Sequence, residues 1–265
     1  MQDMIGNESS RQGMAEAVER GLTGVFFVHG PWGLGKRAFL DSLVGGERGL
    51  VVDSNVDGVR SIRAKVDMAP VLEDVHDVVL LDCDRMSVPA QDACLKLLEE
   101  PPPDSRVWIH ATDVAGVGRA LLSRKRAEFR WTPVDRDKMA EWTSLNGGTD
   151  ELLVKIAAGR PGCYSLMRPD PRFAVLHATV LRAMAGSYDP LLEPLPALLA
   201  EIEGDTPFRE TVFMTLCHAA KTDPLRSGPV LKFASKVLSH PSMNVELHWF
   251  TALASMRVDM ETAVI

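Results

Sequence analysis

The sequence predicts an α/β protein in which a parallel sheet with flanking helices is followed by a chain that is helical to its end. Short apolar runs rich in β-branched and aromatic residues alternate with helical patterns up to residue 134. The first of these runs leads into a glycine-rich turn and then a helix. After Pro133 no further convincing strand pattern occurs, and helical spacing takes over.

The predicted elements follow one another in order. The predicted strands are residues 24–30, 50–55, 78–82, 106–112 and 128–134, the last of which leaves the sheet. The predicted helices are residues 8–20, 37–44, 57–74, 88–100 and 118–125, with a break or kink at Pro70 and a stop at Pro101–Pro103. We therefore predict three domains, namely an α/β domain at 1–134, a small helical domain at 135–170 and a helical C-terminal domain at 171–265.

The composition is that of a soluble globular protein. The 265 residues are 46% hydrophobic and 25% charged. No apolar run is long enough to cross a bilayer and residues 1–12 carry no signal-peptide pattern, so we expect a cytoplasmic protein without membrane contact. The net charge of −7 argues against a protein that coats DNA by itself. None of the four cysteines is spaced as C-x-x-C, so buried free thiols are expected in place of a zinc site.

The glycine-rich turn has the pattern of a phosphate-binding loop. Residues 30–37 fit G-x-x-x-x-G-K, and the candidate cofactor-binding residues are Gly30, Gly33, Gly35, Lys36 and Arg37. Glycines let backbone N–H groups face phosphate oxygens, the helix N-terminus attracts anions, and Lys36 would reach the β- and γ-phosphates. Arg37 stands where a Ser or Thr hydroxyl normally binds Mg²⁺. We therefore expect ATP binding more than Mg²⁺-dependent hydrolysis, and the alternative is a glycine turn that binds nothing.

The third predicted strand ends in an acidic residue, at the edge where open α/β sheets bind ligands. There Asp82 would lie beside the glycine loop and hold Mg²⁺, directly or through water. A hydrolysing site usually follows this Asp with a Glu that orients the attacking water, and Cys83 takes that place. A shift of one residue would put Asp82 at the Glu position and Leu81 at the Asp position, so one acid is missing either way. In the alternative interpretation Asp82 only caps the helix that begins nearby.

Several segments, in the correct order, resemble the AAA+ clamp-loader subunits of bacterial DNA polymerase III, especially the delta-prime and gamma/tau types. The matching segments are IGNESSRQGMAEAVERG, GVRSIRAKVDMAP, QDACLKLLEEPPPDSRVWIHATD, LLSRKRAEFRWTPV and IAAGRPGCYSLM. They cover about residues 5–168, and each is weak or moderate by itself. The C-terminal region matches only in length and helical character.

The resemblance implies a hetero-oligomer, an open ring of five subunits that loads a sliding clamp on primer-template DNA. The C-terminal domains would form a collar. Arg124, in the Ser-Arg segment, would be an arginine finger that reaches the γ-phosphate in a neighbouring subunit; the alternative is a surface arginine. Arg60 and Arg63, three residues apart on one face of the helix at 57–74, are candidate DNA contacts or an ordinary solvated face.

The departures from the family pattern favour a delta-prime-like subunit that binds ATP, hydrolyses it weakly and supplies the finger. The loop lacks its hydroxyl, the acidic pair is incomplete, Lys125 stands where Cys is usual, and the zinc module of many relatives is absent. Arg160 lies near the position of a sensor arginine but is offset from it. The alternatives are a competent ATPase subunit of the same machine and a different AAA+ protein such as a helicase loader, and the segment at 91–103 argues against the latter. The compact length would also suit a phage-encoded loader.

Overall fold

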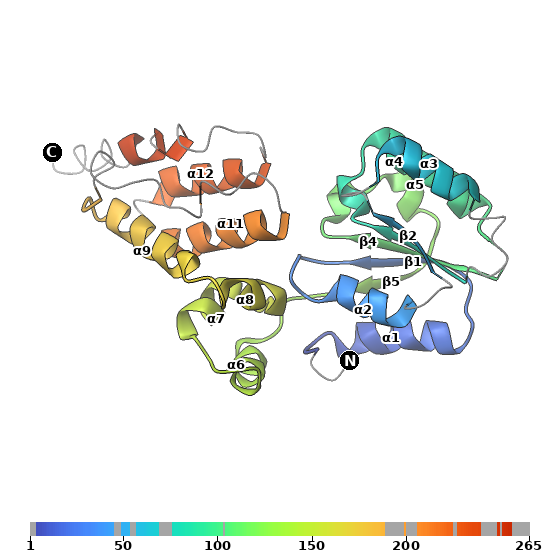
Figure 1. Ribbon diagram of the computed structural model, residues 1–265, viewed down its shortest axis with the longest axis horizontal. Coiled ribbons are helices and arrows are strands. Elements are labelled where there is room, and N and C mark those ends of the chain that lie inside the picture. The colour runs from blue at the N-terminus through green and yellow to red at the C-terminus, as the bar shows by residue number, and fades with distance from the viewer. Residues whose placement is uncertain are drawn as a thin grey trace. The chain divides into compact units, whose positions relative to one another are not determined.

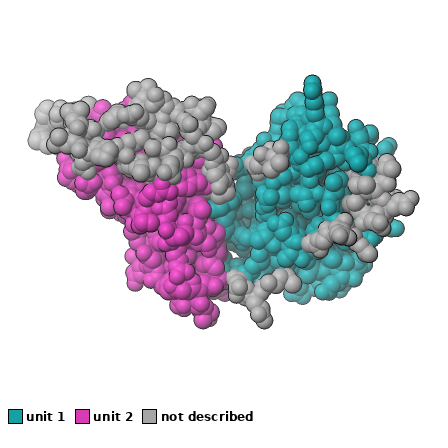
Figure 2. Space-filling model, viewed as in Figure 1, with its two compact units in different colours: residues 1–134 teal, residues 135–265 magenta. Residues whose placement is uncertain are grey.

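The computed structural model describes most of the chain, and it divides into two compact units at Val134 (Figure 2). The described residues are 4–44, 49–53, 57–68, 76–102, 104–188, 199, 206–224, 227–239, 248–249 and 251–255. Unit 1 is residues 1–134 and unit 2 is residues 135–265. The predicted boundary between a small helical domain and a C-terminal domain near residue 170 stays a prediction.

Unit 1 is built on a parallel sheet of five strands (Figure 1). The strands are β1 (Gly24–His29), β2 (Gly49–Asp53), β3 (Asp77–Leu81), β4 (Arg106–Ala111) and β5 (Lys125–Arg130). Their order in the sheet is β2-β3-β4-β1-β5. All residues of β3 and β4 are buried, as the uninterrupted apolar pattern of the third predicted strand indicated for β3. The predicted α/β fold class is confirmed.

Helices cover both faces of this sheet (Figure 1). The bounds are α1 (Glu8–Glu19), α2 (Lys36–Val44), α3 (Val59–Met68), α4 (Val88–Glu99) and α5 (Arg119–Leu122), with short 3₁₀ turns η2 (Cys83–Arg85) and η3 (Val114–Gly116). Side chains of α1 and α2 pack on one face of the sheet, and those of α3, α4 and α5 pack on the other. Because both faces are covered, the sheet exposes only its edges and strand ends to a ligand.

The structure corrects the last predicted strand. The prediction placed it at 128–134, whereas β5 begins at Lys125 and ends at Arg130. The apolar run that suggested a strand contains Trp131, which lies just beyond β5 and is buried against Phe39 of α2. Because β5 begins at Lys125, the helical stretch predicted at 118–125 is only the single turn α5. The third predicted helix is described to Met68, and the predicted break at Pro70 lies outside the described residues.

Unit 2 is helical in the part that the structure describes. Its helices are α6 (Arg136–Leu145), α7 (Glu151–Ala157), α8 (Pro161–Met167), α9 (Arg172–Met184), α11 (Thr206–Ala220) and α12 (Ser227–Ser239). Helix α11 packs against both α9 and α12. At the first of these contacts His177 Nε2 lies 3.0 Å from His218 Nδ1, and burial lowers the pKa of both imidazoles. Within the described ranges, no helix is long and apolar enough to span a bilayer.

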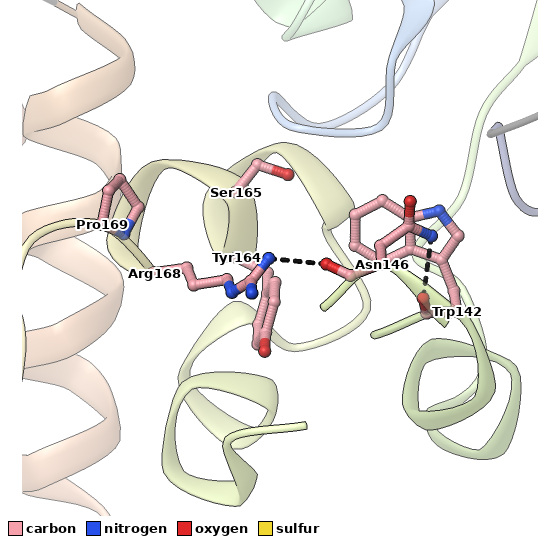
Figure 3. Close-up of a pocket in the computed structure, with 6 residues that line it drawn as sticks. All are labelled: Trp142, Asn146, Tyr164, Ser165, Arg168 and Pro169. Atoms are coloured by element: carbon pink, nitrogen blue, oxygen red, sulfur yellow. Dashed lines mark hydrogen bonds between the residues drawn. The ribbon is translucent and has the colours of Figure 1, made fainter. Parts of the chain in front are cut away.

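A hollow of about 520 Å³ lies between α6 and α8, and its lining is drawn in Figure 3. The guanidinium of Arg168 points across it and donates from Nη1 to the carbonyl oxygen of Asn146 at 2.5 Å, and from Nη2 to that of Gly147. Tyr164 Oη donates to the carbonyl of Gly148 at 2.8 Å. These carbonyls follow the C-terminal end of α6, where a cation is favoured by the helix dipole. Arg168 therefore connects the end of α6 to the end of α8 through two hydrogen bonds.

Candidate nucleotide-binding site

The glycine loop lies between β1 and α2, as the sequence predicts. Gly30, Gly33 and Gly35 have positive φ angles of 139°, 86° and 87°, which let the backbone turn in a way that side chains disfavour. The loop lysine, Lys36, is only 3% exposed. Its ammonium donates to the carbonyl oxygens of Gly30 at 2.5 Å and Pro31 at 2.8 Å. The loop is thus closed around a buried positive charge at a helix N-terminus, the arrangement that attracts a phosphate.

One glycine of the loop is required by a close backbone approach. A Cβ atom on Gly30 would lie 2.2 Å from the carbonyl oxygen of Trp131, the residue after β5. The Trp131 backbone N–H in turn donates to His29 O at 2.8 Å. The end of β5 therefore supports the start of the loop, and Gly30 is fixed there by space as well as by its φ angle.

Arg37 makes an ion pair that reaches another strand. Its Nη2 atom lies 2.9 Å from Oδ2 of Asp53, the last residue of β2. The Asp53 side chain is 12% exposed, whereas that of Arg37 is 51% exposed. Asp53 was not among the predicted site residues. Asp53 lay inside the strand predicted at 50–55, whereas β2 ends at this residue, and its partner could not be identified from spacing.

Asp82 follows β3 directly and has φ 51° and ψ 46°, a left-handed conformation that costs free energy for a residue with a Cβ. Its Oδ1 atom lies 3.1 Å from Nδ1 of His110, on β4, and its backbone N–H donates to the same nitrogen at 3.3 Å. Burial lowers the pKa of His110 and the charge of Lys36 adds to this lowering, whereas the hydrogen bond with Asp82 opposes it. Asp82, His110 and Lys36 therefore form one cluster at the carboxyl edge of the sheet. The alternative role of Asp82 as a helix cap is not seen, because its side chain makes no capping hydrogen bond to η2.

His110 was missed at the sequence level. The available signal was a single imidazole inside the buried strand RVWIHAT, a position where an unpaired polar side chain is costly. That cost predicts a partner, but not which one.

The residue after Asp82 cannot replace a glutamate. Cys83 is fully buried among core side chains, and burial raises the pKa of its thiol well above the usual value. The next acid, Asp84, is engaged with the end of β4. Its carboxylate accepts hydrogen bonds from the Thr112 hydroxyl at 2.5 Å and from the backbone N–H groups of Thr112 and Asp113. Neither side chain is placed to activate a water as a general base.

The donor set does not fit the magnesium ion that a phosphate loop usually binds with its nucleotide. Mg²⁺ takes oxygen ligands, usually from a loop hydroxyl, one or two carboxylates, phosphates and water. In this chain a guanidinium replaces the hydroxyl at position 37, and a buried thiol replaces the second acid at position 83. The carboxylate of Asp82 contacts His110, and that of Asp53 is paired with Arg37. No group of three or more His, Cys, Asp or Glu side chains suited to a metal occurs among the described residues.

Arg124 lies away from the glycine loop of its own chain. It precedes β5, whose first residue pairs with Val25 near the start of β1, whereas the loop follows the end of β1. Five strand residues at about 3.3 Å each separate these two ends by roughly 16 Å. The guanidinium donates to Glu99 at 2.5 Å and to the Ala120 carbonyl at 2.8 Å.

The two candidate DNA-binding residues lie on α3. Arg60 and Arg63 are exposed, while Ile62 and Val66 of the same helix are buried against the sheet. In the part of the chain that the structure describes, neither arginine has an ion pair, in contrast to Lys65 of the same helix, which pairs with a carboxylate at 2.6 Å. The helix therefore presents two cations to solvent.

The comparisons with known proteins are structural. No protein-family model matches the sequence, and no curated protein matches it. The chain is similar to a Thermotoga maritima DNA polymerase III gamma subunit-related protein at 15% identity and a TM-score of 0.52, over 94% of this chain and 99% of that one. Two Thermotoga maritima RuvB structures align less well. One, of a variant, has 18% identity and a TM-score of 0.49 over 66% of this chain and 64% of that one. The other, titled a Holliday junction branch migration motor, has 16% identity and a TM-score of 0.46 over 89% and 76%.

At these identities the comparisons concern the fold. The alignment with the first of the three structures spans both units of this chain, since it covers 94% of the residues. The chain therefore shares the fold of that gamma subunit-related protein, with a five-stranded parallel α/β unit followed by a helical unit.

Proposed function

We propose that this chain is a nucleotide-binding subunit of a sliding-clamp loader, and that it binds ATP but hydrolyses it weakly. The observation that carries the nucleotide site is the buried ammonium of Lys36, held by the carbonyls of Gly30 and Pro31 in a glycine loop at the start of α2. A glycine loop that holds an ammonium at the N-terminus of a helix has the geometry and charge that suit a phosphate.

Weak hydrolysis follows from the same site. A phosphoryl transfer needs a cation that bridges the phosphates and a group that orients the attacking water. Arg37 takes the position of the metal-binding hydroxyl, and Cys83 is a buried neutral thiol. The competing proposal, a fully competent ATPase subunit, would need an acid that these described residues do not supply.

The role in a clamp loader is supported by the fold of the gamma subunit-related protein and by the position of Arg124. An arginine at the opposite end of the sheet from its own loop suits a finger that serves a neighbouring subunit. The proposed partners are other loader subunits in a pentameric ring, a sliding clamp and primer-template DNA, in the cytoplasm. A helicase loader is the alternative with the same fold.

Calorimetry with ATP and ADP tests the nucleotide site. We expect wild type to bind both, and Lys36→Ala to weaken binding at least about tenfold, because it removes a charge-assisted contact to phosphate. Steady-state turnover of wild type alone should stay far below about 1 s⁻¹, the slow end of ordinary enzymes. Equal affinities for the two proteins, or no binding by either, would remove the nucleotide site.

The matched control is Lys65→Ala. This lysine lies on α3 and pairs with Asp57, outside the glycine loop. The Lys65→Ala substitution removes one positive charge, as Lys36→Ala does. A comparable loss of nucleotide affinity in both variants would mean that only net charge matters. Circular dichroism of each variant checks that the fold is retained.

A further inference from the structure

The ion pair of Arg37 lies along the edge of the sheet that the nucleotide would occupy. Asp53 ends β2, and its register partner on β3 is Leu81, the residue before Asp82. Two strands, β3 and β4, separate β2 from β1 in the sheet. At about 4.8 Å between neighbouring strands, Asp53 is roughly 14 Å from the strand that leads into the loop. The Arg37 side chain, which starts beside Lys36, therefore extends along the carboxyl edge toward the end of β2.

The two ends of this ion pair differ in exposure. Asp53 is almost buried, while half of the Arg37 side chain is exposed. A guanidinium has five N–H donors in a planar fork, so the contact with Asp53 at 2.9 Å leaves donors that face solvent. Arg37 is thus held by Asp53 through one part of its guanidinium, and the rest faces solvent. This is the arrangement expected of an arginine that is positioned to bind an anion.

At the same edge the two carboxylates, Asp53 and Asp82, already have partners. The hydroxyl is replaced by Arg37 itself, the second acid by the buried thiol of Cys83, and Asp82 contacts His110. A guanidinium cannot coordinate a metal, and its fixed positive charge would repel one at close range. The positive charge that Mg²⁺ supplies in the usual phosphate loop is therefore carried in this chain by the Arg37 side chain.

We propose that the site binds nucleoside di- and triphosphates free of Mg²⁺, with Arg37 taking over the charge of the metal. Lys36 and Arg37 are adjacent at the start of α2 and together supply two positive charges to the β- and γ-phosphates. Asp53 is a positioning residue that holds the guanidinium at the strand edge. The inference rests on the proposed nucleotide site and specifies which form of the nucleotide it takes.

The test is calorimetric titration of ADP and of ATP into the full chain, once with EDTA and once with excess MgCl₂. For wild type we expect that Mg²⁺ does not tighten binding. Arg37→Ala should weaken binding in EDTA by about tenfold, because a charge-assisted hydrogen bond to phosphate is lost. Arg37→Ser restores the hydroxyl of the usual loop, and its binding should become tighter when Mg²⁺ is present.

Two further variants distinguish the positioning of the Arg37 guanidinium from its charge. Asp53→Asn keeps the shape of the carboxylate but frees the guanidinium, so it should weaken binding in EDTA less than Arg37→Ala does, without creating a response to Mg²⁺. Arg126→Ala is the matched control. Arg126 is an exposed arginine on β5 that donates to Thr23 O at the far end of the sheet, and its loss should leave the affinity unchanged.

The outcomes distinguish this inference from the proposed function. Tightening of wild-type binding by Mg²⁺ of about tenfold or more, or an Arg37→Ala affinity in EDTA equal to that of wild type, would overturn the metal-free site while leaving nucleotide binding in place. No nucleotide binding by wild type under either condition would overturn the proposed function itself. Thermal unfolding of each variant with and without ADP gives a second readout, because a ligand that binds the folded state raises its Tm.

Discussion

A single glycine determines whether the loop can form. Gly30→Ala places a methyl group 2.2 Å from the Trp131 carbonyl oxygen, at a φ angle of 139° that side chains disfavour. We expect it to lower the free energy of unfolding by more than about 1 kcal/mol and to abolish nucleotide binding, because the loop must shift to relieve the contact. Chemical denaturation and calorimetry on the same protein measure both effects.

Gly58→Ala is the control for this prediction. Gly58 precedes α3 and has no positive φ angle, and a methyl group at this position would meet no atom within 4 Å. Its replacement should change stability by no more than about 0.5 kcal/mol and leave nucleotide binding as in wild type. If Gly30→Ala behaves in the same way, the close approach of the two backbones does not determine the loop.

At the residue scale, sequence patterns located the loop but not its neighbours. The glycines, Lys36 and Arg37 form one contiguous motif, so spacing alone was sufficient to find them. Asp53 and His110 come from other strands, and their contacts depend on sheet order and register. Those are properties of tertiary structure, which no local pattern encodes. The arginine at position 37 could be recognised in the sequence, whereas its ion-pair partner, Asp53, could not.

At the element scale, buried strands were easier to predict than the edge strand. Strands β3 and β4 are buried throughout and mostly apolar because both faces are covered, and the prediction found them within a residue. Strand β5 pairs with β1 alone and carries Lys125, Arg126 and Glu128, so its composition resembles a loop or helix. The predicted strand at 128–134 therefore overlaps β5 only at 128–130. Pairing with β1, and not hydrophobicity, defines this element.

Helix α3 carries a prediction of its own about DNA. Its two exposed arginines are proposed phosphate contacts that act only in the assembled loader, because a chain of net charge −7 repels DNA as a monomer. We expect the double variant Arg60→Ala/Arg63→Ala to weaken DNA binding by the assembled complex and to reduce its salt dependence, measured by fluorescence anisotropy over a range of salt concentrations.

Lys96→Ala is the control for α3. Lys96 is an exposed cation on the neighbouring helix α4 and is paired with Asp67 at 2.7 Å. Its replacement removes a charge that is already paired with a carboxylate, so DNA binding by the complex should change little. Tight binding of duplex DNA by the isolated wild-type chain at physiological salt would contradict the assembly-dependent role.

At the scale of the whole molecule, the fold class was predictable and the partners are not. Alternating strand and helix patterns, followed by helical spacing after Pro133, indicated an α/β unit and then a helical one, and the structure divides at Val134. The boundary between the two units could be predicted because the period of the hydrophobic pattern changes there. Contacts between subunits produce no periodic pattern in the sequence. A residue that acts on another subunit has the same appearance as any surface residue of its own chain.

Arg124 is such a residue, and the last prediction concerns its action on a neighbour. The structure separates it from its own loop by the length of β1, so a role in its own site is excluded by distance. In the isolated chain its guanidinium pairs with Glu99, at the end of α4, and it would have to exchange that partner for a phosphate upon assembly. Arg124→Ala should leave folding and nucleotide binding of the isolated chain unchanged.

The loss should appear only in the assembled loader, as reduced hydrolysis at a neighbouring site. An arginine finger contributes on the order of 10³-fold or more to phosphoryl transfer, so a decrease of that order in DNA- and clamp-stimulated ATPase activity is expected. Arg124→Lys should restore little of it, because an ammonium lacks the planar fork. Arg126→Ala serves as the control because that arginine is close in sequence and bonded to Thr23 O. Equal activities of the Arg124→Ala and Arg126→Ala complexes, or unfolding of Arg124→Ala, would show that the ion pair with Glu99 is its whole role.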